Sequence, residues 1–175
     1  LLNKKQLYKE LKIPKNYFYL PNHYWSHKNH MVVLKALNIL KNRDIFVVST
    51  GFQQDHRNLK YFETIKNFIK NNKLKKKYIY LGIVPYKISM SLMLNSIAVI
   101  NPSKFEGWSS TVEQAKSFGK KIILSNLIFH KEQKPKRSFF FNTDDYKSLS
   151  KILVKCLNHY DYKKEKKIVN ENYKT

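Results

Sequence analysis

The chain has 175 residues, of which 42% are hydrophobic, enough for one domain with a sizeable core and too few for two. This apolar and aromatic content is ordinary for a globular protein and excludes wholesale disorder. No run of about 18 apolar residues occurs, so no membrane-spanning helix is expected. The formal net charge of +22 points instead to an anionic partner.

The beginning of the sequence and its cysteine content indicate where the protein works. Residues Leu1 to Lys5 contain neither a starting Met nor the apolar core of a signal peptide, so we expect a piece of a longer chain. Cys156 is the only cysteine, which excludes an internal disulfide. A reducing compartment fits this cysteine content, and we therefore expect a cytoplasmic location.

The positive charge comes almost entirely from lysine, since arginine occurs only as Arg43, Arg57 and Arg137. Proteins that read nucleic acids usually rely on Arg for bidentate and stacked contacts, so a nucleic-acid-binding domain is the weaker interpretation. Lysine clusters occur at 73–77 and 163–167, and a solvated face explains both. The alternative is peripheral contact with the anionic inner face of the plasma membrane, where each Lys adds about 1 kcal/mol.

Short β-prone runs alternate with amphipathic helical stretches along the chain. In chain order, the predicted elements are helix 4–11, strand 17–20, helix 31–40, strand 45–49, helix 58–71, strand 78–81, helix 85–95, strand 97–100, helix 111–118, strand 122–125, strand 138–141 and helix 145–158. Loops are expected over 23–29 and around Pro135, and Thr143 or Asp144 is expected to cap the helix that begins at Asp145.

This alternation predicts an α/β fold, a Rossmann-like parallel sheet of about six strands with helices on both faces. In such a sheet, ligands bind outside the carboxyl ends of the strands. The loops expected to matter are therefore 21–29, 50–57, 82–86, 101–110 and 125–135.

The stretch from Phe105 to Gly119 is the most informative one, because it places a loop and a helix start directly after a strand. Ser110 to Glu113 fits a capping box, and Gly119 fits a helix stop. Free N–H groups at such a helix start bind anions, whereas the carboxylate of Glu106 suits hydroxyl groups. Together they describe a sugar phosphate site, although a capped core helix after a surface loop explains the same residues.

The segment from Pro102 to Gly119 resembles the donor-binding motif of retaining GT-B glycosyltransferases of family 4. Glu106 takes the place of the first Glu of the family pattern, and Gly119 matches its closing Gly thirteen positions later. The second Glu of the pattern falls on Gln114, which is a departure. Gln114 still accepts a hydrogen bond from a ribose hydroxyl but carries no charge, and Glu113 is assigned to the capping box.

A second loop, 22–30, resembles the basic loop that holds the donor diphosphate in this family. Lys28 matches the family Lys, whereas His23 stands where the family has Arg. Asn22 and Asn29 replace glycines of that pattern. The three histidines at 23, 27 and 30 also raise the alternative of zinc, but no Cys or nearby carboxylate completes a tetrahedral site.

Two further loops resemble the wall that holds the nucleobase in this family. The segment from Leu81 to Val84 resembles its Leu-Gly-x-Val pattern, so the backbone of Ile83 and Val84 is expected to contact the base. Gly51 follows the second strand and borders the same cleft. His130 lies on the loop 125–135, near the expected donor site.

The resemblance implies the C-terminal, nucleotide-sugar-binding half of a GT-B glycosyltransferase. It implies three segments: 1–16 as a lead-in helix or linker from a missing N-terminal domain, 17–160 as the donor-binding domain, and 161–175 as a basic helix or tail. The implied catalytic residues are Glu106 and Lys28. The implied donor-binding residues are His23, Gly107, Trp108, Ser109, Ser110, Thr111, Gln114, Gly51, Ile83 and Val84.

The implied reaction moves a hexosyl unit from a UDP- or GDP-sugar to a glycan or lipid-linked acceptor, with retention and with no cofactor or obligatory metal. The acceptor would be held by the missing N-terminal domain. Two alternatives stay open at this point. One is an inactive nucleotide-sugar-binding relative, suggested by Gln114 and His23, and the other is a basic nucleic-acid-binding domain.

Overall fold

The computed structural model describes residues 1–173 and contains one parallel sheet of six strands, ordered β3-β2-β1-β4-β5-β6. The strands are β1 (Phe18–Pro21), β2 (Val47–Thr50), β3 (Tyr78–Tyr80), β4 (Val99–Asn101), β5 (Ile122–Ser125) and β6 (Ser138–Phe141). The order along the sheet reverses between β1 and β4, which lie side by side. The predicted α/β fold with a parallel sheet is thus confirmed.

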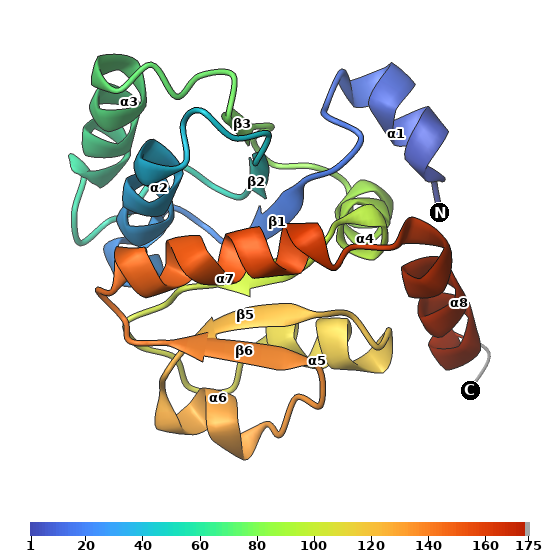
Figure 1. Cartoon of the computed structure of the whole chain (residues 1–175). Coiled ribbons are helices and arrows are strands. Elements are labelled where there is room, and N and C mark those ends of the chain that lie inside the picture. The colour runs from blue at the N-terminus through green and yellow to red at the C-terminus, as the bar shows by residue number, and fades with distance from the viewer. Residues whose placement is uncertain (174–175) are drawn as a thin grey trace.

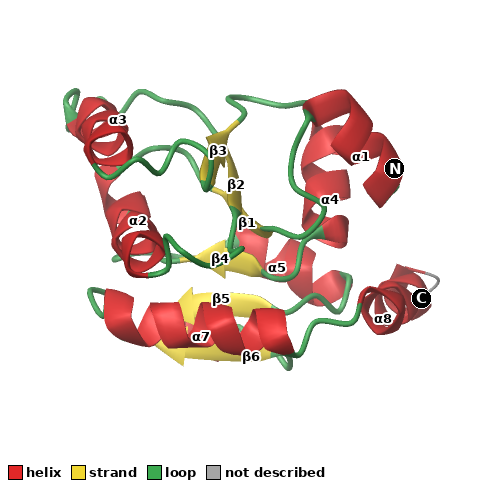
Figure 2. Ribbon diagram, turned by 45° about the horizontal axis from the view of Figure 1, so that its top comes forward, coloured by secondary structure: helices red, strands yellow, loops and turns green. Residues whose placement is uncertain are grey.

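Helices cover both faces of the sheet (Figures 1 and 2). They are α1 (Lys4–Leu11), the 3₁₀ helix η1 (Ser26–Lys28), α2 (His30–Ile39), α3 (Tyr61–Asn71), α4 (Tyr86–Asn95), α5 (Ser110–Ser117), α6 (Ile128–Glu132), α7 (Tyr146–Asn158) and α8 (Tyr162–Tyr173). One core joins the sheet to α2, α3 and α7, and a second core joins it to α1, α4 and α5. Within the described residues, none of these helices has both the length and the apolar character needed to cross a membrane.

The central strand shows why these apolar runs form strands. Phe18 and Leu20 belong to the core that contains α2, whereas Tyr17 and Tyr19 belong to the core that contains α4. Successive side chains of a strand point to opposite faces, and here both faces are covered. A continuous apolar run is therefore required at this position of the sheet.

Three local predictions differ from the structure. The expected loop 23–29 contains η1, and the expected loop before Pro135 contains α6. Neither helix has a side-chain N-cap, so its local sequence carries no start signal. The N-cap of α7 is Asp145, whose carboxylate accepts the Ser148 N–H at 2.8 Å, and not Thr143 or Asp144.

The C-terminal helix α8 is attached to the sheet through one buried carboxylate. Glu165 accepts two hydrogen bonds from the Arg137 guanidinium, at 2.7 and 3.1 Å, and lies 3.0 Å from the Lys121 ammonium. Burial raises the pKa of Glu165, but the bonds from Arg137 and Lys121 outweigh it, and the net pKa is lowered. This planar, two-bond contact holds α8 beside β5 and β6.

Lys120 is a buried lysine whose titration should be visible in the stability of the fold. Its ammonium donates to the carbonyl groups of Leu94 and Ser96 at the end of α4, at 3.2 and 2.8 Å. Burial lowers its pKa from 10.5 to about 8. The unfolded chain therefore binds this proton more tightly than the folded chain, and folding becomes more favourable as the pH rises above about 8.

We expect the free energy of unfolding to rise by about 2 kcal/mol between about pH 7.5 and about pH 9.5 through this group alone. Urea unfolding at the two pH values measures this rise in the wild type and in Lys120→Met, a variant that keeps the apolar stem. The difference between the two proteins is the contribution of Lys120. Lys136→Met, at an exposed lysine, is the matched control. The same pH dependence in the wild type and in Lys120→Met would contradict the assignment.

Candidate functional site

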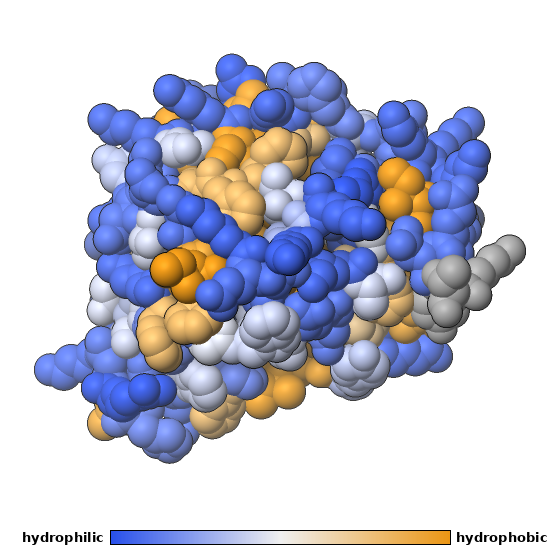
Figure 3. Space-filling view, turned by 90° about the horizontal axis from the view of Figure 1, so that it is seen from below, coloured by the Kyte–Doolittle hydropathy of each residue, from blue (hydrophilic) through white to orange (hydrophobic). Residues whose placement is uncertain are grey.

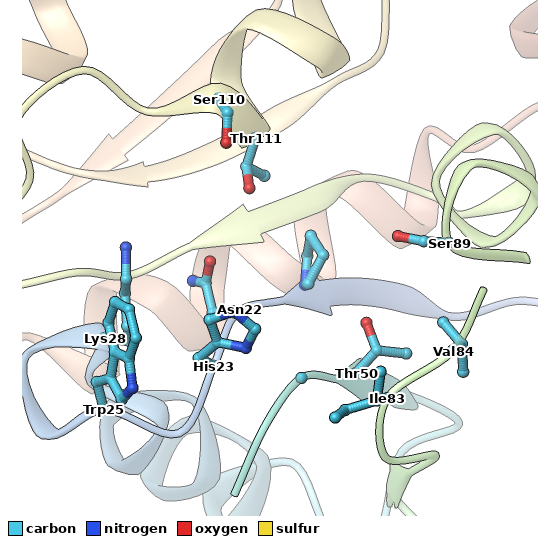
Figure 4. A pocket seen from close by; sticks show the side chains of 12 residues that line it. Asn22, His23, Trp25, Lys28, Thr50, Ile83, Val84, Ser89, Ser110 and Thr111 are labelled. Atoms are coloured by element: carbon cyan, nitrogen blue, oxygen red, sulfur yellow. The ribbon is translucent and has the colours of Figure 1, made fainter. Parts of the chain in front are cut away.

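A cavity of about 370 Å³ lies at the carboxyl ends of the central strands, beside the point where the strand order reverses (Figure 4). Its lining residues are Pro21, Asn22, His23, Trp25, Lys28, Thr50, Gly51, Ile83, Val84, Ser89, Ser110 and Thr111. They come from the last residues of β1 and β2, from the loops after β1, β2 and β3 (the first of which contains η1), and from the first turns of α4 and α5. In parallel α/β sheets this is the position where ligands bind.

Lys28 and Glu106, which are far apart in the sequence, are in direct contact beside this cavity. The Lys28 ammonium lies 2.7 Å from Glu106 Oε1, and the side chains are only 15% and 9% exposed. Ser103 Oγ donates to the same carboxylate oxygen at 2.7 Å. Burial raises the pKa of Glu106, but the bonds from Lys28 and Ser103 outweigh it and lower the pKa below its usual value. Glu106 is therefore ionised at neutral pH.

Buried amide side chains connect the two loops that carry this ion pair. Asn22 Nδ2 donates to Asn101 Oδ1 at 3.1 Å, and Ser103 Oγ, whose single proton Glu106 and Asn101 share, lies 2.9 Å from the same oxygen. With the Ser103–Glu106 and Glu106–Lys28 contacts, these bonds run continuously from the end of β1 to η1 by way of the loop after β4. Such a network holds Lys28 and Glu106 in one arrangement.

The backbone around Lys28 is held from two directions. Asp55, a buried carboxylate in the loop after β2, accepts the Ser26 N–H at 2.7 Å, and this bond is the main cause of its lowered pKa. Asn29 follows with a left-handed φ of 55° and donates to the Pro102 and Thr143 carbonyl groups. Asn tolerates this conformation better than other non-glycine residues, which explains why it can replace glycine here.

His23 lines the cavity in a defined neutral form. Its Nδ1 accepts the Phe52 N–H at 2.9 Å, so the ring proton resides on Nε2. Burial, and to a lesser degree the nearby Lys28, lowers the pKa of His23. The residue is therefore a neutral hydrogen-bond donor at physiological pH and supplies no positive charge.

Gly51 lines the cavity where two loops come unusually close. Its φ is +143°, and a Cβ atom built on it would lie 2.3 Å from the carbonyl oxygen of Asn22. The Gly51 N–H donates to the Gly82 carbonyl at 2.9 Å, which joins the loops after β2 and β3. Only glycine fits this position without moving the chain.

The start of α5 differs from the predicted capping box. The N-cap is Ser109, whose Oγ accepts the Val112 N–H at 3.4 Å and the Asn101 amide at 2.9 Å. Glu113 instead contacts Gln133 and Lys116, at 2.8 and 3.0 Å. The prediction was wrong because a distant residue, Gln133, forms hydrogen bonds both with the Glu113 carboxylate and with the backbone N–H and carbonyl of Ser109.

With Ser109 as the cap, Ser110 and Thr111 form the first turn of α5 and line the cavity (Figure 4). N–H groups in the first turn of a helix have no partner within the helix and bear partial positive charge. This side of the cavity can therefore donate to an anion. Ile83 and Val84 give the opposite end an apolar wall.

Five of the residues predicted for the site lie outside the cavity lining: Glu106, Gly107, Trp108, Ser109 and Gln114. Trp108 is 64% exposed, and nothing lies within 4 Å of the Cβ position of Gly107. Gln114 is half-buried on α5. The structure also brings in residues that the sequence did not single out, namely Asp55, Asn101, Ser103 and Ser89.

The histidines of the first loop do not converge on a common point. His30 is buried and stacks on Tyr24 at 4.0 Å, and burial lowers its pKa to about 3. Among residues 1–173, no group of three or more His, Cys, Asp or Glu side chains is placed to hold a metal ion. His130 is also buried, with Nδ1 2.9 Å from the Ser125 carbonyl and Nε2 without a partner among the described residues.

The fold and the cavity together define a doubly wound α/β domain with a cavity at its switch point, lined by Lys28 and the first turn of α5. The chain belongs to the family of Glycosyl transferases group 1, whose family model matches residues 3–175. This confirms that the two loop motifs belong to a group 1 glycosyltransferase. A search of curated proteins found no match.

Solved structures similar to this chain include glycosyltransferases. A glycosyltransferase from Rickettsia africae has a TM-score of 0.80 and 22% identity, with 97% of this chain and 45% of that chain covered. Anabaena Alr3699/HepE in complex with UDP and glucose has a TM-score of 0.79 and 14% identity, with 97% and 45% covered. The C-terminal domain of LpcC from Francisella tularensis has a TM-score of 0.74 and 17% identity, with 99% and 91% covered. The chain thus spans about 45% of the length of the first two.

Proposed function

We propose that this chain is the donor-binding half of a retaining glycosyltransferase of family 4 type, which takes a hexosyl unit from a UDP- or GDP-sugar. The observation that carries the proposal is the Lys28–Glu106 contact, 2.7 Å long, beside a cavity lined by the first turn of α5. The cation and the helix N–H groups thus face one space, and the carboxylate of Glu106 lies beside it in contact with Lys28. The complex of the Anabaena relative with UDP and glucose supports a nucleotide-sugar donor.

In this proposal, the positive groups stabilise the leaving diphosphate. The bond between the sugar C1 and the phosphate oxygen would break with its electron pair on that oxygen. C1 would form a new bond to an acceptor hydroxyl oxygen, whose proton would pass to the leaving diphosphate. The Lys28 ammonium, the N–H groups of Ser110 and Thr111, and His23 Nε2–H would neutralise or bind the developing charge. These donors require no metal ion for that task.

Glu106 would accept hydrogen bonds from sugar hydroxyl groups while it remains paired with Lys28. Ile83, Val84 and Gly51 would contact the nucleobase from the far end of the cavity. The roles of Gly107, Trp108 and Ser109 in donor binding, and that of Gln114 with the ribose, are predictions of the same kind for residues that lie outside the lining. The acceptor, a glycan or a lipid-linked glycan, would be held outside this chain.

Calorimetric titration of the chain with UDP, GDP and UMP tests this proposal. We expect a nucleoside diphosphate to bind at least tenfold more tightly than the monophosphate, because the second phosphate gains a charge-assisted hydrogen bond from Lys28. Lys28→Met should abolish that preference, and Lys35→Met, at an exposed lysine on α2, should leave it intact. Equal affinities for UDP and UMP in the wild type would contradict the proposal.

The neutral state of His23 supports a second candidate, a nucleotide-sugar-binding relative without turnover. A neutral ring stabilises a leaving diphosphate less than the guanidinium of the family pattern would. His23→Arg should then raise the affinity for UDP, and the intact protein should transfer no sugar in either form. Transfer by the wild-type protein would reject this candidate.

A further inference from the structure

The basic residues of this domain are concentrated at one end of the sheet. All six strands are parallel, so every loop that precedes a strand lies at one edge and every loop that follows a strand lies at the other. The preceding loops are 12–17, 40–46, 72–77, 96–98, 118–121 and 133–137. The following loops, which surround the donor cavity, are 22–29, 51–60, 81–85, 102–109, 126–127 and 142–145.

The two edges differ sharply in charge. The preceding loops contain thirteen Lys and Arg residues and one acidic residue, Asp44, which gives +12. The following loops contain four basic and four acidic residues and are neutral. More than half of the net charge of +22 therefore lies at the edge remote from the donor cavity. In Figure 1 this edge is the end near α8, and the arrowheads of β5 and β6 point away from it.

Nine of these thirteen residues are exposed, and we call them the basic edge: two each in loops 12–17, 40–46 and 133–137, and three in loop 72–77. Within the described part of the chain, none of the nine forms an ion pair with a carboxylate. The remaining four are occupied: Lys120 is buried, Lys121 and Arg137 contact Glu165, and Lys77 lies 3.7 Å from Asp44.

Stabilisation of helix ends accounts for only part of this charge. Each preceding loop follows the C-terminus of a helix, where one or two cations interact favourably with the helix dipole. Loop 72–77 exceeds that need, because it carries four lysines in six residues after α3. Lys73, Lys75 and Lys76 extend into solvent there without a carboxylate partner among the described residues.

We infer that the basic edge binds the surface of a membrane that contains anionic phospholipids, and that it does so while the donor cavity at the opposite edge stays open. Eight of the nine residues are Lys and only Arg43 is Arg, which suits point contacts with phosphate headgroups better than readout of nucleic-acid bases. Tyr17, Phe46 and Phe118 are the aromatic residues of these loops, and none is exposed, so the loops themselves offer no stacking platform for bases. The exposed Tyr8 of α1 lies next to the edge, with the Lys15 ammonium 5.7 Å from its ring centroid.

The contact would depend on charge and not on insertion into the lipid. Among the described residues, none of the exposed large hydrophobic side chains lies in a loop that precedes a strand. The neighbouring face, seen from below Figure 1, shows hydrophobic side chains in groups among hydrophilic ones (Figure 3). Each exposed Lys near an anionic surface should raise the partition coefficient roughly fivefold. Since the Debye length is about 8 Å at physiological salt, added salt should weaken the contact.

Cosedimentation of the chain with lipid vesicles tests this inference independently of the donor site. We expect binding to vesicles of phosphatidylcholine with phosphatidylglycerol and none to phosphatidylcholine alone. The triple variant Lys73→Gln, Lys75→Gln, Lys76→Gln should reduce binding to the anionic vesicles roughly a hundredfold. Its affinity for UDP should equal that of the wild type, because these residues lie at the edge opposite the cavity.

The matched control removes the same charge elsewhere. It combines Lys60→Gln, directly before α3, with Lys147→Gln and Lys151→Gln on α7. This control should bind anionic vesicles within about fivefold of the wild type. Equal losses in the two triple variants would overturn the inference, since only the total charge would then matter. Preferential retention of a random DNA or RNA oligonucleotide over the anionic vesicles in direct competition would also overturn it.

Discussion

Replacing Gly51 by Ala should cost roughly 3 to 5 kcal/mol of folding stability and abolish nucleotide binding. The added Cβ would lie 2.3 Å from the Asn22 carbonyl oxygen and 2.9 Å from the His23 Cα, and both contacts are with backbone that cannot rotate away. The backbone φ of +143° adds strain for any residue with a side chain. The loop after β1 must therefore move, and it carries His23 and leads to Lys28.

Two other glycines provide graded controls for this substitution. Gly107→Ala should change stability by less than about 0.5 kcal/mol, because nothing lies within 4 Å of its Cβ position. Gly82→Ala meets no atom either, but its φ of +76° should cost about 1 kcal/mol. Urea midpoints and UDP titrations of the three variants rank them directly. A loss of stability in Gly51→Ala no larger than that in Gly82→Ala would show that the close approach of the two loops does not exist in solution.

Lys28→Met should lower folding stability by about 3 kcal/mol and weaken UDP binding about a hundredfold, for two separable reasons. Stability falls because the buried Glu106 carboxylate loses its cation and keeps only Ser103. Binding falls because the diphosphate loses its ammonium donor. The Met side chain keeps most of the volume of the lysine stem, so packing changes little.

The double variant Lys28→Met, Glu106→Gln separates these effects. Removing both charges leaves no unpaired carboxylate, so stability should return to within about 1 kcal/mol of the wild type while UDP binding stays weak. Glu106→Gln alone should bind UDP nearly normally and a UDP-sugar more weakly. Recovery of UDP affinity in the double variant would show that Lys28 acts only as the partner of Glu106.

The pH dependence of this pair has a definite sign. The pKa of Glu106 is lowered in the folded chain, so its contribution to stability is present above about pH 4.5 and is lost as the pH falls through the folded value. Buried His30 acts in the same direction, because its pKa of about 3 lies below the usual 6.5 and the unfolded chain takes up its proton first. As the pH falls, the free energy of unfolding should therefore decrease less steeply in Glu106→Gln than in the wild type.

The positions of the strands and helices could be predicted because their signals are local. Runs such as Ile122 to Ser125 and the apolar stripe of α3 follow from residue type and spacing, and the predicted bounds differ from the observed ones by only a few residues. Lys28 and Glu106 were found from motifs that follow two strands, and the parallel sheet then places the ends of those strands side by side. The helices η1 and α6 were missed because no capping residue marks their starts.

By itself, the sequence determined the α/β class, the loops that surround the ligand site and the family, because periodicity, turn residues and motif spacing act over short distances along the chain. The tertiary structure alone decided the N-cap of α5, the neutral tautomer of His23 and the support of η1 by Asp55. It also decided that the lysines gather at one edge. Each of these depends on a partner from a distant segment, and a distant partner is set by the order and direction of the strands.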